Sequence, residues 1–359
     1  MAPSRKHLVL AGIAAASITA VLAGCSAAPT SSSTSASSSY LPCVIGDTGG
    51  FTDHSFNQLS LDGVVKAADK IGAGYKKYQS KSSDDYATGI SSLISEKCKL
   101  IVAPGFNFIA SVKSSATANP KTDFAMIDDN SIDLPNVKDI VFETDEAAFL
   151  GGYIAAAYSK SGVVATWGGA QYPSVTIYMD GVADGVKYYN EQKGKDVQLL
   201  GWDVASQKGT FVGNFTDQNS AKSITQNFID QKADVIIPVA GSLYQGAAAA
   251  ITGSGSDAVL EGVDADIYQT DPKYKALMLV SILKKVDAAS ADVVEAAASE
   301  KSFDNTTYIG TLKNGGIGIS SLHDFASKVP STLAAEVTAI QAGIIDGSIK
   351  VESPSTFNK

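Results

Sequence analysis

The chain has 359 residues, of which 45% are hydrophobic and 18% are charged, and its formal net charge is −9. This acidic balance argues against nucleic-acid binding, because nothing in the sequence resembles a basic stripe. The three cysteines and three histidines lack metal-ligand spacing, and no P-loop, GxSxG or HExxH motif is present. We therefore expect no enzyme chemistry, no cofactor and no metal site.

The N-terminal segment has the pattern of a secretory signal peptide. Arg5 and Lys6 precede an uncharged run at 8–22 that is too short to span a bilayer comfortably. The run ends in Leu-Ala-Gly-Cys, which resembles the lipobox of bacterial lipoproteins, with Cys25 as the residue that would carry lipid such as palmitate. Removal of residues 1–24 takes the net charge to −11. An ordinary secretory signal followed by a chance cysteine is the alternative.

The segment 25–39 is predicted to be a tether. From 26 to 39 it is almost wholly Ser, Thr, Ala and Pro, which offers too few large apolar groups to offset the entropy of ordering. No later segment has the long uncharged apolar run of a membrane-spanning helix. We therefore expect a protein that is anchored by lipid at the extracytoplasmic face of the cell membrane. The remaining length, about 320 residues, predicts two domains.

Short apolar runs alternate with longer amphipathic stretches along the rest of the chain, as in α/β proteins with parallel sheets. Strands are predicted at 41–46, 74–79, 99–103, 122–127, 138–143, 161–167, 196–202, 234–239, 257–263, 277–282 and 308–312. Helices are predicted near 55–70, 84–97, 107–118, 145–158, 175–190, 217–231, 242–252, 286–299 and 330–346. We predict two doubly wound lobes joined by a hinge, one from 40–160 plus 283–312 and the other from 161–282 plus 313–359.

Loops rich in glycine or aspartate follow several predicted strands, three in each half of the chain. Ligands of open α/β sheets bind at the carboxyl ends of strands, where such loops lead into helices. Two lobes that point their strand ends at a common cleft would bring these six loops together: 46–50, 104–107, 127–130, 167–169, 238–241 and 262–266.

Two cysteines remain after Cys25, and each stands at the start of an apolar run. In a doubly wound sheet the first and third strands are neighbours, so Cys43 and Cys98 would lie close to one another. The compartment outside the membrane is oxidising, and we predict a disulfide between them. Two buried free thiols are the alternative, because the sequence does not determine the strand register that the bond geometry requires.

The stretch 47–58 carries the most site chemistry. A strand ends in the carboxylate of Asp47, two glycines allow a tight turn, and Phe56 emerges in the first turn of the next helix. Phe56 can stack on a planar ligand, Asp47 can accept hydrogen bonds from hydroxyls, and Asn57 can donate and accept. From these residues alone, a capped helix whose phenylalanine packs into the core is an equal alternative.

An ordered set of segments between about 43 and about 320 resembles the basic membrane protein (BMP, PnrA-like) family. These are nucleoside-binding lipoproteins that serve ABC importers and have the type I periplasmic-binding-protein fold. The segments are DTGGFTDHSFNQ at 47–58, FAMID at 124–128, GGY at 151–153, DGVADGV at 180–186, VGNFTD at 212–217, PVAG at 238–241, GVDAD at 262–266 and SILKKVD at 281–287. The chain departs from the family pattern at Tyr244, where a glycine-richer turn is usual, and at 176–179, where a phenylalanine is expected.

The resemblance implies that two aromatic rings, one from each lobe, sandwich a nucleobase while polar side chains bind its edge and the ribose. The implied aromatic residues are Phe56 and Phe215, the base-edge residues are Asn57 and Asp128, the ribose residues are Asp47, Asp264 and Lys284, and Gly241 completes the set. Asp266 competes with Asp264 for its role. The alternatives are a loop aromatic packed on its own lobe for Phe215 and an exposed lysine at a helix start for Lys284.

The resemblance therefore implies a protein that captures a nucleoside, with a purine favoured, and delivers it to the permease of an ABC importer. A monomer is the expectation, although the sequence itself sets no oligomeric state. A sugar- or signal-binding protein of the same fold is the first alternative, because sugars also stack on aromatic rings and bind carboxylates. A tethered enzyme of nucleoside metabolism is the second, and it would require turnover as well as binding.

Overall fold

The computed structural model describes residues 39–357, which belong to one compact unit that spans Ser37–Lys359. The predicted signal peptide at 1–24, the lipidation site Cys25 and the tether up to residue 38 lie outside the described residues. In the described part of the chain, no helix combines the length and the apolar character that crossing a membrane requires.

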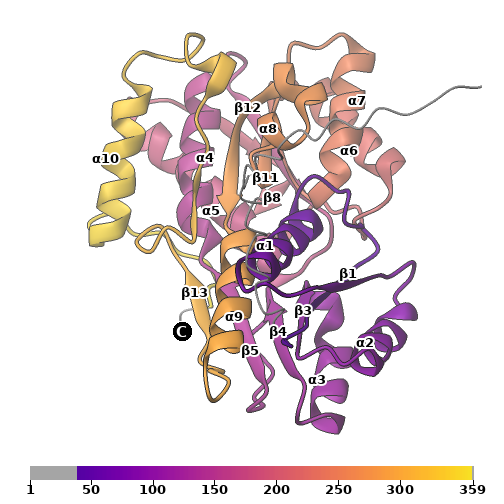
Figure 1. Ribbon diagram of the computed structural model, residues 1–359. Coiled ribbons are helices and arrows are strands. Elements are labelled where there is room, and N and C mark those ends of the chain that lie inside the picture. The colour runs from indigo at the N-terminus through magenta and orange to yellow at the C-terminus, as the bar shows by residue number, and fades with distance from the viewer. Residues whose placement is uncertain (1–38, 358–359) are drawn as a thin grey trace, which may run out of the picture. The chain divides into compact units, whose positions relative to one another are not determined.

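The first sheet has six parallel strands in the order β13-β5-β4-β3-β1-β2 and occupies the lower part of the unit in Figure 1. Its strands are β1 (Pro42–Gly46), β2 (Lys76–Gln79), β3 (Leu100–Pro104), β4 (Asp123–Ile127), β5 (Val137–Phe142) and β13 (Tyr308–Gly310). Helices α1 (Phe56–Lys70) and α9 (Val286–Ser299) cover the face that includes Val44, and α2 (Asp85–Ser95) and α3 (Ile109–Ala118) cover the face of Cys43 and Ile45. Coverage on both faces explains why the central strands are continuous apolar runs.

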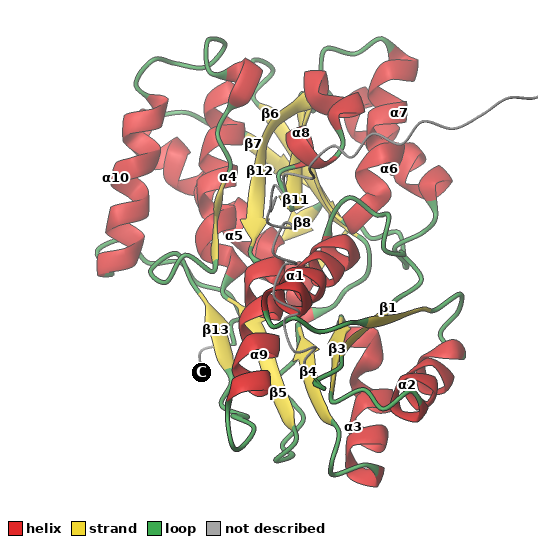
Figure 2. Ribbon diagram, viewed as in Figure 1, coloured by secondary structure: helices red, strands yellow, loops and turns green. Residues whose placement is uncertain are grey.

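The second sheet also has six strands, in the order β14-β12-β11-β10-β6-β7, and β14 alone is antiparallel to its neighbour. Its strands are β6 (Val163–Gly168), β7 (Gln198–Leu200), β10 (Val235–Val239), β11 (Val259–Asp264), β12 (Met278–Lys284) and β14 (Ile317–Ile319). One face packs against α4 (Thr144–Tyr158) and α5 (Pro173–Lys193), with α10 (Leu333–Asp346) against α4. The other face packs against α6 (Gln218–Asp230), α7 (Tyr244–Ser254) and α8 (Ile267–Thr270). Figure 2 shows these helices on the two sides of the strands.

The two sheets repeat one strand order. In each, the second strand in the chain lies at an edge and is followed by the first, third, fourth and fifth strands, which is the doubly wound arrangement with its switch point between the first and third strands. This confirms the predicted α/β fold with two parallel sheets. The small hairpin of β8 (Trp202–Asp203) and β9 (Lys208–Gly209) was not predicted, and neither was β14.

The chain passes between the sheets after β5, after β12 and between β13 and β14. Helix α4 packs closely along α5, because Gly152 and Gly185 present no side chain to the backbone of the facing helix. Residues 144–158 therefore lie with the second sheet, although the expected lobe boundary assigns them to the first lobe.

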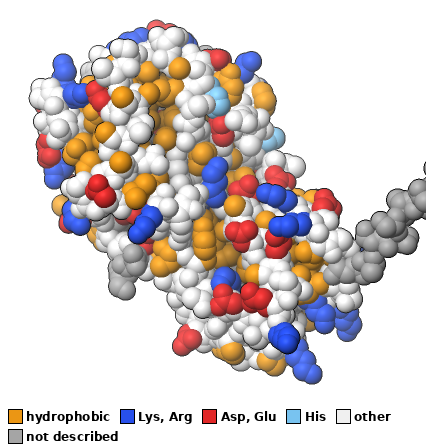
Figure 3. Space-filling model, turned by 60° about the vertical axis from the view of Figure 1, so that its left-hand side comes forward, with side chains coloured by type: hydrophobic (Ala, Val, Ile, Leu, Met, Phe, Trp, Pro, Cys, Tyr) orange, Lys and Arg blue, Asp and Glu red, His pale blue; other side chains and the backbone are white. Residues whose placement is uncertain are grey.

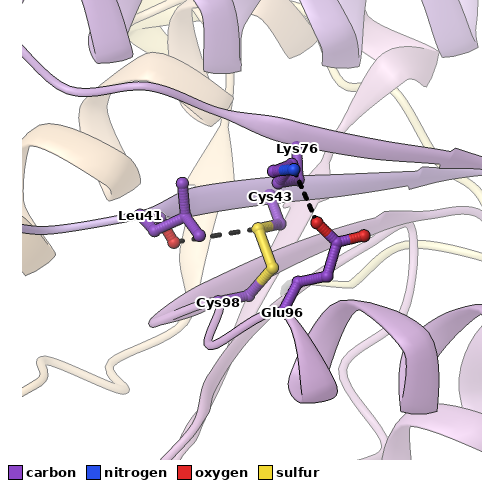
Figure 4. The surroundings of a disulfide bond; sticks show 5 residues. All are labelled: Leu41, Cys43, Lys76, Glu96 and Cys98. Atoms are coloured by element: carbon purple, nitrogen blue, oxygen red, sulfur yellow. Dashed lines mark hydrogen bonds and ion pairs between the residues drawn. A yellow bond between two sulfur atoms is a disulfide. The ribbon is translucent and has the colours of Figure 1, made fainter.

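The predicted disulfide is present. Cys43 and Cys98 are bonded, with their Cα atoms 5.9 Å apart, and the bond joins the N-terminal ends of the neighbouring strands β1 and β3 (Figure 4). Both residues are buried. An ion pair between Lys76 and Glu96, 2.7 Å, lies beside the bond (Figure 4).

We expect the double variant Cys43→Ala/Cys98→Ala to lose about 4 kcal/mol of unfolding free energy at most. The bond closes a loop with a sequence separation of 55 residues, and closing a loop of that length removes chain entropy from the unfolded state. Urea unfolding of oxidised protein, reduced protein and the variant measures the effect. Reduced protein and the variant should agree, and equal midpoints for oxidised and reduced protein would contradict the expectation.

A candidate ligand-binding cavity between the two sheets

A cavity lies between the carboxyl-terminal ends of the two sheets. From the first sheet it is lined by the loops after β1, β3 and β4, and from the second by the ends of β10, β11 and β12 together with the start of α5. These positions flank the switch points of both sheets, where open α/β folds bind ligands. All eight predicted site residues line this one cavity: Asp47, Phe56, Asn57, Asp128, Phe215, Gly241, Asp264 and Lys284.

Burial divides the lining into a floor and a rim. The charged side chains and the amide of Asn57 are buried, with Asn57 and Lys284 each 3% exposed. The aromatic residues Phe56 and Phe215 are half-buried. We call the buried polar residues the floor and the half-buried residues the rim.

The first polar group of the floor is built on the N-terminus of α1. Asp53 accepts hydrogen bonds from the backbone N–H groups of Ser55, Asn57 and Gln58, at 2.8–3.0 Å, and so caps the helix. The amide of Asn57 donates to Asp47 Oδ1 at 2.8 Å and to Asp53 Oδ2 at 3.0 Å, while its Oδ1 accepts from the backbone N–H of Asp47. Both amide protons of Asn57 are therefore used within the protein.

Asp47 is held with one carboxylate oxygen occupied. Oδ1 accepts from Asn57 and from the N–H of Gly49, 2.8 Å, and among the described residues no hydrogen bond is made by Oδ2. Burial, together with the negative charge of Asp53, raises the pKa of Asp47 to about 6, because removal from water disfavours the charged form. Asp47 thus offers the cavity an acceptor that titrates near neutral pH.

The second polar group of the floor is centred on Lys284, the last residue of β12. Its Nζ lies 2.9 Å from both carboxylate oxygens of Asp128 and 3.7 Å from Asp264 Oδ1. Asp264 also accepts from the Tyr178 hydroxyl at 2.8 Å and the Ser55 hydroxyl at 3.2 Å. Burial and the adjacent carboxylate of Asp264 raise the pKa of Tyr178 well above its usual value, so Tyr178 stays a donor.

Two features make this second group a candidate functional site. Asp128 and Asp264 have positive φ angles of 71° and 67°. Residues other than glycine adopt this backbone conformation at a cost of about 1 kcal/mol or more, and such residues cluster at functional sites. The Lys284 ammonium lies 5.0 Å from the ring centroid of Phe56 and 5.4 Å from that of Tyr178, within range of cation–π attraction. The lysine is thus fixed by charge and by aromatic rings.

The two rim phenylalanines each rest on a glycine at a strand end. The Phe56 ring packs on Gly105 after β3, and the Phe215 ring packs so closely on Gly169 after β6 that no side chain would fit there. Gly105 has φ 107°, a conformation that favours glycine. The rings therefore enter the cavity from different sheets, as the sequence predicted for the two aromatics.

The structure groups the polar residues differently from the sequence-based expectation. Asn57 and Asp128 were expected to act together on a base edge, but Asn57 pairs with Asp47 while Asp128 pairs with Lys284. Lys284 is buried in a strand rather than exposed at a helix start. The choice between Asp264 and Asp266 is also clear, because Asp264 lines the cavity whereas Asp266 pairs with His323.

Sequence reasoning missed several residues of the lining. Tyr178 stands in the segment where the family pattern has a phenylalanine, and its hydroxyl contacts Asp264. The others were given no role, although Asp53 lies within 47–58 and two of them lie in the predicted loop 104–107, and they meet only through the fold: Asp53, Phe106, Asn107, Tyr172 and Ser174. Tyr244, where the chain departs from the family pattern, is not part of the lining, and its hydroxyl donates to Asp271 at 2.8 Å.

Two charge features bear on other functions. Among the described residues, no group of three or more His, Cys, Asp or Glu side chains is arranged to hold a metal ion. On the face shown in Figure 3, acidic and basic side chains lie interspersed and do not form a basic stripe.

Comparison with known proteins identifies the fold and the family. The family model of PnrA-like ABC transporter substrate-binding proteins (Bmp) matches residues 43–353. The chain belongs to this family. Among solved structures, an ABC transporter solute-binding protein from Aeropyrum pernix superimposes with a TM-score of 0.78, covering 89% of this chain and 95% of that one at 24% identity.

Two curated relatives support the same assignment. The nucleoside-binding protein BmpA of an ABC transporter from Lactococcus lactis is 29% identical over 97% of this chain and 99% of its own length. Basic membrane protein A1 from Borrelia garinii is 28% identical over 84% of this chain and 86% of its own. PnrA-like proteins are substrate-binding proteins and not enzymes, which confirms the expectation that the chain is no enzyme.

Proposed function

We propose that this PnrA-like protein captures a nucleoside, with a purine favoured, and delivers it to the permease of an ABC importer. The observation that carries the proposal is the presence of two separate polar groups on the floor, with aromatic rings from both sheets at the rim. A nucleoside has the same division into a planar base with a polar edge and a sugar with adjacent hydroxyls. The name of the Lactococcus relative as a nucleoside-binding protein supports this solute.

The Lys284 group suits a ribose. Carboxylates accept hydrogen bonds from hydroxyls and an ammonium group donates to them, so Asp128, Asp264 and Lys284 together can satisfy a pair of neighbouring hydroxyls in both roles. All three side chains are buried, and hydrogen bonds to charged groups in such surroundings are strong and selective. We therefore assign Asp128 to the ribose end, together with Asp264 and Lys284.

The Asp47 group suits the edge of a base. Asp47 Oδ2 is the available acceptor, because the Asn57 amide and the Gly49 N–H both donate to Oδ1. Asn57 acts here as a positioning residue that fixes Asp47. Phe56 and Phe215 supply the faces, and a bicyclic purine would bury more apolar area against them than a pyrimidine.

The charge of the cavity favours nucleosides over nucleotides. The charged side chains in its lining are the four carboxylates of Asp47, Asp53, Asp128 and Asp264 and the single ammonium of Lys284. A phosphate group in this enclosed space would be repelled by the carboxylates and would lose its hydration. The same argument disfavours acidic sugars as ligands.

The surroundings of the cavity fit a lipid-anchored receptor. We propose that Cys25 carries the lipid, that 25–39 is a tether, and that the two sheets are the cores of two lobes that close on the solute. The disulfide lies at the N-terminal end of β1, next to the point where the tether enters the folded unit. It would stiffen that entry point.

A thermal-shift screen tests the solute class. Inosine, guanosine or adenosine should raise the unfolding temperature, because a ligand selective for the native state stabilises it. Inosine 5′-monophosphate, ribose and galactose should give little or no shift at the same concentration. A shift produced by the sugars and not by any nucleoside would overturn the proposal in favour of a sugar-binding protein of the same fold.

Inosine binding should depend on pH through Asp47. The ionised carboxylate accepts the N1–H of the base, so binding requires loss of the proton that the free protein holds below the Asp47 pKa of about 6. We expect the affinity to be constant above pH 7 and to fall about tenfold per pH unit below that pKa. Calorimetric titration from pH 5 to pH 8 measures this.

The matched control is Asp47→Asn, which keeps the size of the side chain and removes the titration. Its inosine affinity should be lower at pH 7 and flat between pH 5 and pH 7. Equal pH profiles for the variant and the unmodified protein would remove Asp47 from the base site.

A further inference from the structure

Three residues connect the two sheets at the rim, and neither the predicted site nor the floor includes them. Phe106 lies in the 3-10 turn η1 (Phe106–Phe108) after β3 of the first sheet, and Tyr172 lies between β6 and α5 of the second. Their rings stack with centroids 4.5 Å apart and an interplanar angle of 17°. The Tyr172 hydroxyl donates to Asn107 Oδ1 at 2.9 Å.

We propose that Tyr172, Phe106 and Asn107 form a latch that holds the two sheets closed over the bound solute and sets how long it is retained. The proposal rests on the proposed function for the identity of the solute, although the latch itself requires only that the cavity binds a ligand. The latch residues are positioning residues, because they act through closure.

The local backbone presents these residues rigidly. Tyr172 precedes Pro173, the first residue of α5, and has the extended conformation, φ −109° and ψ 152°, that the following proline imposes. On the other side, Gly105 with φ 107° turns the chain from β3 into η1. The backbone at the end of each sheet therefore fixes the position of Tyr172 on one side and of Phe106 and Asn107 on the other, independently of the contact between them.

The latch forms only when the sheets approach. All three residues are half-buried and line the cavity, so in an open cleft the hydroxyl of Tyr172 and the amide of Asn107 would face water. The Tyr172 ring also stacks with the Phe215 ring, with centroids 6.2 Å apart and an interplanar angle of 30°. The latch therefore contacts the aromatic ring that is proposed to stack on the base. Contacts made only in the closed state slow ligand release more than they change association.

Dissociation rates test whether the hydrogen bond acts as a latch. With inosine as the probe in stopped-flow displacement, Tyr172→Phe should release ligand about 3- to 10-fold faster, the range expected for one hydrogen bond, with the association rate changed less than twofold. Asn107→Ala should have a similar effect, and the double variant should equal either single variant, because both remove the same bond. Additive effects or an unchanged dissociation rate would overturn the proposal.

A second measurement is independent of the solute. Spin labels at Lys113→Cys on α3 and Lys222→Cys on α6, both exposed positions, report the separation of the sheets, while Cys43 and Cys98 stay in their disulfide. Without ligand, the added change Phe106→Ala/Tyr172→Ala should shift the distance distribution toward longer separations at unchanged far-ultraviolet circular dichroism. An unchanged distribution contradicts the latch. A shift in this variant, together with no response to inosine in the unmodified protein, would retain the latch and refute the nucleoside.

Discussion

Lys284→Met is expected to abolish inosine binding and to lower the unfolding free energy by about 3–5 kcal/mol, the usual cost of breaking a buried ion pair. The Lys284 side chain is 3% exposed, and its ammonium group lies 2.9 Å from both oxygens of Asp128. Methionine has a similar length but no charge, so Asp128 and Asp264 would be left buried without a cation. Binding would also lose the ammonium group, which is the only positively charged donor among the three residues proposed to bind the ribose.

The matched control is Lys70→Met on α1, where the lysine pairs with Glu295 on the surface and its side chain is 67% exposed. Exposed ion pairs contribute about 1 kcal/mol or less, and this one lies outside the cavity lining. Its unfolding midpoint and inosine affinity should stay near those of the unmodified protein. Normal inosine affinity in a folded Lys284→Met variant would contradict the role of the lysine in the site.

Glu261→Gln is expected to change the pH dependence of stability. Glu261 in β11 is fully buried, its carboxylate has no hydrogen-bond partner within the described residues, and it lies against Gly151 of α4. Burial raises its pKa well above the usual value, so the folded protein keeps a proton that the unfolded chain loses. Stability from this group is therefore present below the unfolded pKa of about 4.3 and is lost as pH rises, by about 1.4 kcal/mol per pH unit.

Glutamine has the same shape and no proton to lose. Near pH 4.5 the variant and the unmodified protein should have similar unfolding free energies, and by pH 7 the variant should be more stable by the accumulated difference. Urea unfolding at several pH values measures the two slopes, and Glu300→Gln at an exposed position serves as the control with an unchanged slope. Parallel pH profiles for Glu261→Gln and the unmodified protein would show that Glu261 is ionised in the folded state.

The regular elements could be predicted from the sequence because they depend on local pattern. All eleven predicted strands and nine predicted helices occur, with ends shifted by a few residues. The elements that were not predicted are short or lack periodicity. Strand β14, for example, has three residues. The disulfide followed from the strand order, since β1 and β3 are neighbours. The strands and helices require no knowledge of where side chains point, whereas the disulfide also needed a register that only the structure shows.

The grouping of the site residues could not be predicted in the same way. The partners of Asn57 and Asp128 depend on turns after the strands and on the positive φ of Asp128, which the sequence does not reveal. An exposed lysine at a helix start remained the alternative for Lys284, because β12 continues two residues beyond its predicted end. Tyr172 contacts Asn107 only because the two sheets approach one another, so no spacing in the sequence predicts this pair.

The most direct measurement for the central claim is calorimetric titration of the protein with inosine, hypoxanthine and ribose, each also titrated into Phe56→Ala. Two polar groups flanked by aromatic rings predict that inosine binds more than about 100-fold tighter than either of its parts, because only the whole nucleoside fills both ends of the cavity. Loss of the Phe56 ring should weaken inosine binding by about tenfold or more without changing the fold. Ribose that binds as tightly as inosine, or a Phe56→Ala variant with unchanged inosine affinity, would contradict the account.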